Sequence, residues 1–189
     1  MSRSNRFPFA ALGAALACAL AALLAASPAD ASDHFFSYDP ANDATRQTAG
    51  ALTFEFRQKL IWVRVLSVRS TEGQATALLK PANERALGPG GLSRVIGPGG
   101  HERDLYQVEG ADQGVEMIHA FCPGSTRAWM AFGHIAEGAP LRVLVIGDAP
   151  GGGPARLCQT FDFTFHGEWR LPGGTHPPER DLLVPQFPY

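Results

Sequence analysis

Hydrophobic and polar residues alternate with a period of two in several short stretches of the chain. Residues 161–165 place three phenylalanines on one side and Asp162 and Thr164 on the other, and residues 52–56 repeat this pattern. Such alternation is typical of a strand with one buried face and one wet face. Residues 59–69 are rich in β-branched and aromatic side chains and predict a long central strand.

The same signals predict an all-β fold with many short elements. We expect further strands at residues 75–80, 104–109, 115–122, 141–147 and 157–166, with a hairpin connection at 147–154. Residues 125–136 fit either a helix begun by Ser125 or Thr126, or a strand, and Gly133 favours the strand. Residues 40–47 can form a short helical turn. Together these expected elements predict a mainly all-β domain, an antiparallel β-sandwich or small barrel with at most one or two short helices.

A glycine- and proline-rich segment interrupts this pattern. The tetrapeptide Gly-Pro-Gly-Gly occurs at residues 88–91 and again at 97–100. Such sequences form neither helix interiors nor central strands, so we expect a long loop over residues 87–100. Glycine amides can cradle anions, but no strand-to-helix pattern and no Lys-Ser/Thr accompany these glycines, which favours a plain flexible loop.

The N-terminal residues predict export. Arg3 and Arg6 precede an uncharged apolar run over residues 7–26, and Ala29 and Ala31 supply the small residues of a cleavage site. We therefore expect a signal peptide over residues 1–31, a mature chain that begins at Ser32, and a periplasmic or secreted location. The alternatives are an uncleaved membrane anchor, since the run could span a bilayer, and a lipoprotein site in the middle of that run.

The remaining chain divides into three parts in this interpretation. Residues 32–50 are expected to form an N-terminal extension, residues 51–170 a single β-rich domain, and residues 171–189 a proline-rich extended tail. Trp169, which follows the last expected strand, is expected to cover an edge of the core while its charged neighbours stay in water.

The charge balance excludes some partners. The chain carries a formal charge of -2, and removal of Arg3, Arg6 and Asp30 with the signal peptide, a net +1, leaves -3. No block of basic residues is present, which argues against nucleic acid and gives no reason to expect attraction to an anionic membrane surface. We expect no membrane span after cleavage of the signal.

Two cysteines, Cys122 and Cys158, remain after cleavage, and in an oxidising compartment we expect them to form a structural disulfide. The alternative is a zinc site that adds His119 and His166. Strand geometry counts against it, because residues 158 and 166 of one strand would lie about 26 Å apart.

No residue set gives a catalytic signature. The Gly-x-Ser-x-Gly elbow is absent from the sequence, and Ser125 with His119 or His134 nearby is a weak nucleophile candidate. The titratable run that starts at His101 is expected to be a solvated strand entry. We assign no catalytic residue, metal ligand or cofactor.

These observations favour an exported, non-catalytic binding or accessory module that recognises a protein or a component of the cell envelope. The alternative is a small exported hydrolase or metal-dependent enzyme that uses His101, His119, His134 and His166.

Overall fold

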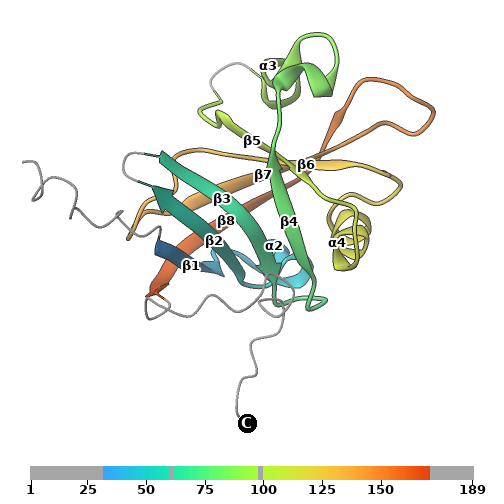
Figure 1. Cartoon of the computed structure of the whole chain (residues 1–189). Helices are drawn as coiled ribbons and strands as arrows, with labels where there is room; N and C mark the ends of the chain where they lie inside the picture. Colours follow the sequence, from blue (N-terminus) through green and yellow to red (C-terminus); the bar gives the residue numbers. More distant parts are fainter. Residues whose placement is uncertain (1–31, 60–61, 98–99, 171–189) are drawn as a thin grey trace, which may run out of the picture. The chain divides into compact units, whose positions relative to one another are not determined.

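Eight antiparallel strands close into a β-barrel (Figure 1). The structure is a computed structural model that describes residues 32–59, 62–97 and 100–170. The chain divides into two units, Met1–Asp30 and Ala31–Tyr189, and the barrel belongs to the second. The expected signal peptide and proline-rich tail lie outside the described residues.

Each strand pairs with the next along the chain, and the last strand returns to pair with the first. Of the two expected architectures the barrel is therefore correct, and closure leaves no unpaired sheet edge. The strands are β1 (Ser32–Pro40), β2 (Leu52–Lys59), β3 (Trp62–Ser70), β4 (Thr76–Pro81), β5 (Asp104–Val108), β6 (Ala128–Phe132), β7 (Leu141–Gly147) and β8 (Arg156–Arg170).

Short helices lie in the connections. They are α2 (Asp43–Thr48), the 3-10 helix η1 (Glu84–Leu87), α3 (Gly91–Ile96) and α4 (Gln113–Phe121). The described residues thus hold three α-helices, where one or two helices were expected. Asn42 caps the N-terminus of α2, and its side chain accepts a hydrogen bond from the Thr45 amide at 2.8 Å. Within the described part of the chain, no helix has the length and apolar character needed to cross a bilayer.

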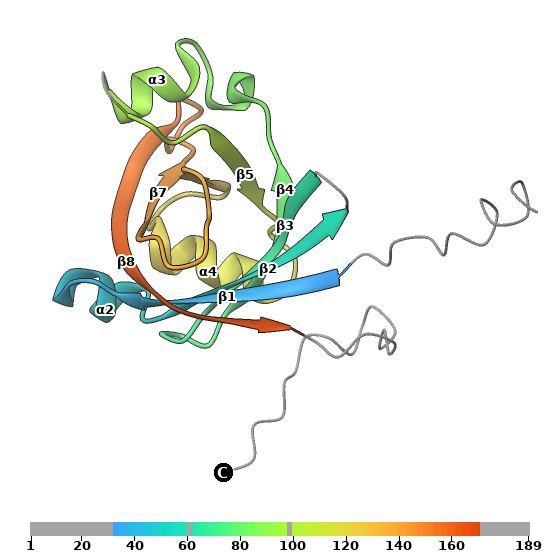
Figure 2. The same cartoon turned by 90° about the vertical axis from the view of Figure 1, so that its left-hand side faces the viewer.

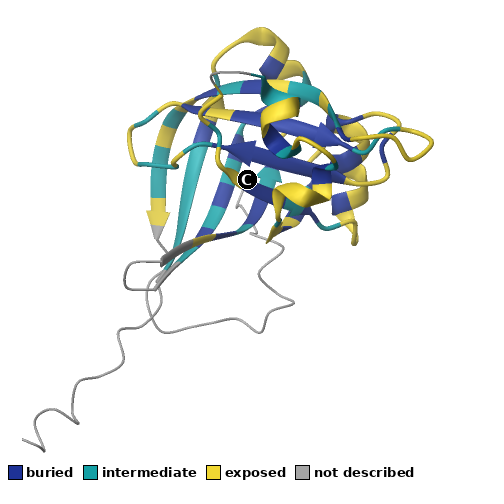
Figure 3. Ribbon diagram, turned by 90° about the horizontal axis from the view of Figure 1, so that it is seen from above, coloured by how far each residue is buried: buried dark blue, intermediate teal, exposed yellow. Residues whose placement is uncertain are grey.

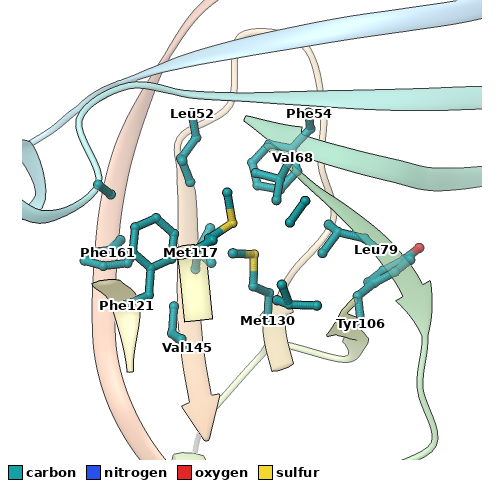
Figure 4. Packing of buried hydrophobic residues seen from close by; sticks show 14 of the residues in the cluster. Leu52, Phe54, Val68, Leu79, Tyr106, Met117, Phe121, Met130, Val145 and Phe161 are labelled. Atoms are coloured by element: carbon teal, nitrogen blue, oxygen red, sulfur yellow. The ribbon is translucent and has the colours of Figure 1, made fainter. Parts of the chain in front are cut away.

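The core fills the inside of the barrel. Alternate residues of the strands contribute to this core. Strands β6 and β7 are buried at nearly every position, because a second cluster covers their outer side, and Figure 3 shows the buried positions along the ribbon. Leu52, Phe54, Val68, Tyr106 and Met130 point toward one another from four different strands (Figure 4). Helix α4 completes this core at one end of the barrel, across which it lies in Figure 2, because its residues Met117, Ile118 and Phe121 are buried in the same cluster.

A second, smaller apolar cluster lies on the outer side of the sheet. Leu87 of η1 and Leu92 of α3 pack there with Trp129 of β6 and Leu144 of β7. The expected plain loop over residues 87–100 is therefore wrong in part, since it contains the end of η1 and all of α3. The two glycine-proline repeats flank α3, with Gly90 and Gly97 in the left-handed region at φ 80° and 78°.

Two of the expected elements are corrected by the structure. Residues 32–40, expected in an extension outside the β domain, form β1, which pairs with both β2 and β8. Residues 115–122, expected as a strand, lie largely in α4, where burial of positions 114, 117, 118 and 121 follows helical spacing.

Other expectations about the elements are confirmed. The preferred strand within residues 125–136 is β6, and residues 147–154 connect β7 to β8. The long strand expected over residues 59–69 is divided, since Lys59 ends β2 and pairs with Trp62, which begins β3.

Candidate functional site at the seam between β1 and β8

The seam where β8 meets β1 contains a β-bulge that reverses the orientation of the side chains beyond it. Ser37 pairs with Gly167, but its neighbour Tyr38 pairs with Phe165, so His166 is an extra residue in β8. Before the bulge, Phe165 and the phenylalanines two and four residues earlier face the core. Because a strand alternates with a period of two, one inserted residue exchanges its two faces. Beyond the bulge, Glu168 therefore shares the inner face and Trp169 shares the outer face.

This exchange corrects the expectation that Trp169 covers the core. Its side chain is 59% exposed, and it pairs on the outer face with Phe35 of β1. Its indole Nε1 donates a hydrogen bond to Ser37 Oγ at 3.2 Å, and that oxygen lies 3.1 Å from Thr53 Oγ1 of β2. Since Ser37 is two residues along β1 from Phe35, the indole leans across the seam and is held there.

Apart from Phe35, the side chains around Trp169 on the outer surface are polar, and several of them have a hydrogen-bond partner. Asp39 Oδ2 lies 2.8 Å from Nδ1 of the bulged His166. In β2, Glu55 accepts a hydrogen bond from Ser67 at 2.7 Å. We call the outward side chains of β1, β2 and β8 around Trp169 the seam face. They are Phe35, Ser37, Asp39, Thr53, Glu55 and Trp169.

On the inner face the same bulge places a carboxylate inside the rim of the barrel. Glu168 Oε1 lies 2.6 Å from His34 Nδ1, and the two side chains are only 15% and 13% exposed. Burial of charged groups normally requires such a partner. Beyond the bulge a glutamate is nearly buried while the adjacent tryptophan is exposed, which reverses the usual burial of these two residue types.

Aromatic rings separate this pair from the deeper core. Phe36 lies 4.9 Å from Phe56 and 5.5 Å from Phe165 between ring centroids, and Phe165 also contacts Tyr38 at 5.6 Å. Tyr38 is completely buried, and its hydroxyl has no hydrogen-bond partner among the described residues. Desolvation by burial raises the pKa of Tyr38 to about 12.

The two expected disulfide cysteines lie together at the other end of β8. Their Cα atoms are 5.2 Å apart and their sulfurs are at bonding distance, which fits the usual range for a disulfide. Cys122 caps the C-terminus of α4. Cys158 lies at a second bulge, because Val145 pairs with Gln159 while Ile146 pairs with Leu157. This bulge allows Cys158 to meet Cys122 although the strand alternation assigns it to the polar side.

Polar contacts beside this cysteine pair are structural. The Ser125 hydroxyl donates to the backbone oxygen of Asp148 at 2.9 Å and lies 3.1 Å from Cys122 Sγ. Burial opposes ionisation of the Asp148 carboxylate, but hydrogen bonds from the Arg127 and Thr126 amides and the Thr126 hydroxyl hold its pKa below the ordinary value. The Ser125 hydroxyl is therefore hydrogen-bonded within a turn, and none of its described partners is a histidine.

The histidines considered from the sequence are dispersed. His119 lies exposed on α4, His101 and His134 lie exposed in connections, and His166 pairs with Asp39 on the outer face. No group of three or more His, Cys, Asp or Glu side chains within residues 32–59, 62–97 and 100–170 is arranged to hold a metal ion. The proposed zinc set is thus separated, with its cysteines paired to each other.

Sequence reasoning missed His34, Glu168 and the exposed position of Trp169. A signal for His34 was present, because His34, Phe36 and Tyr38 alternate in the way expected for an inward face. The reversal at His166 had no local signal, because a bulge is fixed by the partner strand.

Comparison with known proteins gives no assignment: no family model, no curated protein and no solved structure matches the chain.

Proposed function

We propose that this chain is an exported, non-catalytic binding or accessory module, and that it recognises a protein or cell-envelope component through the seam face. The observation that carries the proposal is the bulge at His166, which exposes Trp169 where strict alternation would bury it. Bulges commonly re-aim a side chain at functional positions. Exposed tryptophans are also frequent energetic centres of binding surfaces.

The barrel supplies a rigid support for this surface. The seam face lies on three neighbouring hydrogen-bonded strands, so its side chains have fixed spacing before any ligand arrives. The hydrogen bond from Trp169 to Ser37 restricts the indole further. Both features lower the entropy lost on binding.

Export is supported by two independent features. The first 31 residues carry the charge, apolar run and small residues of a signal peptide. The cysteine pair at bonding distance is compatible with an oxidising compartment.

Site-specific photo-crosslinking in intact producing cells tests the proposal. A photoreactive phenylalanine analogue replaces Trp169 in the full-length chain, and a matched variant carries it at Leu157, which is 42% exposed near the other end of β8. We expect a discrete crosslinked product from position 169 in the envelope fraction and none from position 157. Equal products from both positions, or none from position 169, would contradict the proposal, as would recovery of the chain from the cytoplasm with its signal intact.

A further inference from the structure

We infer that the seam face binds a carbohydrate chain of the cell envelope, with Trp169 as the stacking platform. This inference rests on the proposed function and names the chemistry of its ligand. It is carried by the orientation of the indole and by the hydroxyl groups beside it.

The indole is placed to offer a ring face. Its Nε1 reaches Ser37 Oγ at 3.2 Å, although the residue directly opposite Trp169 is Phe35, so the ring leans over β1. With 59% of the side chain exposed, the ring surface remains accessible to a ligand. An aromatic ring binds a flat apolar surface such as the C–H face of a sugar ring, and here its own polar atom is already satisfied.

The groups beside the ring suit a ligand with many hydroxyls. The indole donates to Ser37 Oγ, which lies 3.1 Å from Thr53 Oγ1, and each hydroxyl can both donate and accept. Glu55, directly opposite Phe35 on β2, adds carboxylate oxygens that accept hydrogen bonds. Sugar hydroxyls can satisfy both kinds of group.

Two of the carboxylates at this surface have a neighbouring basic side chain. Asp39 Oδ2 lies 2.8 Å from His166 Nδ1, and Asp33 at the edge of this surface is paired with Arg57 at 3.0 Å. These contacts limit the attraction of the two carboxylates for a cationic ligand.

A protein partner fits this surface less well. The centre of a protein interface is a contiguous, desolvated apolar patch enclosed by polar residues. Around Trp169 only Phe35 is apolar among the seam face residues. The other large exposed apolar side chains of the described residues, Leu78, Val115 and Leu157, lie on β4, on α4 and near the start of β8.

Cosedimentation of the purified mature protein with envelope polysaccharide tests the inference. The probes are peptidoglycan sacculi and lipid-free surface polysaccharide from the producing cells. We compare the unmodified protein with Trp169→Ala, Trp169→Phe and the control Leu157→Ala, each verified as folded by circular dichroism. Loss of a binding centre of this kind weakens binding about 10- to 30-fold.

We expect at least one probe to bind the unmodified protein and Leu157→Ala equally, and Trp169→Ala to bind about 10- to 30-fold more weakly. Trp169→Phe keeps a ring face and should retain most of the affinity, and added salt should have little effect. Absence of binding to both probes, or equal binding by Trp169→Ala, would overturn the inference. If photo-crosslinking from position 169 then captures a protein, the proposed function holds without the carbohydrate, and if it captures nothing, both fail.

Discussion

Replacement of Tyr38 by phenylalanine should stabilise the barrel. The Tyr38 hydroxyl is fully buried and has no partner among the described residues, so in the folded state it loses its hydrogen bonds to water without replacement. An unsatisfied buried polar group costs about 1–3 kcal/mol. Phenylalanine keeps the ring contacts with Phe54 and Phe165 and leaves only a small void, so we expect a net gain of about 1–2 kcal/mol.

Alkaline pH should enlarge this difference. The pKa of Tyr38 is about 12 in the folded protein and 10.0 in its ordinary state, so between these values the unfolded chain loses a proton that the folded chain retains. The native state binds more protons in this window, and the free energy of unfolding therefore falls as pH rises from 10 to 12. The difference between the two pKa values corresponds to about 2–3 kcal/mol that the unmodified protein loses in addition to any loss it shares with Tyr38→Phe through Tyr106.

Urea unfolding at neutral pH and at several values between pH 10 and 12 measures both effects. At neutral pH Tyr106→Phe is the matched control, because the Tyr106 hydroxyl accepts a hydrogen bond from the Val65 amide at 3.5 Å and its loss should be neutral or destabilising. It is not a control in alkali, since burial also raises the pKa of Tyr106. A Tyr38→Phe variant that is less stable than the unmodified protein, or that loses stability equally in alkali, would refute this reasoning.

Three further predictions concern the cysteine end of the barrel. Asp148→Asn should lower the free energy of unfolding by about 1–2 kcal/mol at neutral pH. The difference from the unmodified protein should shrink as pH falls below 3.8, because the lowered pKa contributes stability only while the carboxylate is ionised. Chemical unfolding at several pH values measures this difference. Replacement of both Cys122 and Cys158 by alanine should cost about 4 kcal/mol for their sequence separation of 36, and intact mass should show the unmodified protein gaining two hydrogens on reduction. Gly147→Ala should destabilise the fold by about 1–3 kcal/mol, because a Cβ there would collide with Cys122 Sγ and Ser125 Oγ. Thermal unfolding measures this loss, and an unchanged melting temperature would contradict the close packing around Gly147.

Local periodicity predicted most of the strands because the burial pattern of a strand depends on residues that are adjacent in the sequence. Residues 52–56 and 161–165 alternate cleanly, and both lie in barrel strands with their phenylalanines inward. Helix α4 was mistaken for a strand because Val115 and Ile118 are β-branched and the segment is short. Its burial of Met117, Ile118 and Phe121 nonetheless follows helical spacing.

Long-range pairing explains what the sequence could not predict. The choice between barrel and sandwich depends on whether β1 meets β8, and those strands are more than a hundred residues apart. The bulges at Cys158 and His166 likewise depend on the register of the partner strands. The bulge at His166 decides which way Trp169 and Glu168 point. The candidate site could therefore not be predicted from the sequence, although all of its residues could be read there.

The central claim is that the seam face is occupied in the cell envelope, and hydroxyl-radical footprinting tests it most directly. Oxidation of Trp169 is compared between intact cells and the purified protein, with exposed Leu157 as the accessible reference and buried Trp129 as the protected one. The account predicts that Trp169 is oxidised several-fold less in cells than in the purified protein, while Leu157 is oxidised equally in both. Equal oxidation of Trp169 in cells and in solution would contradict it.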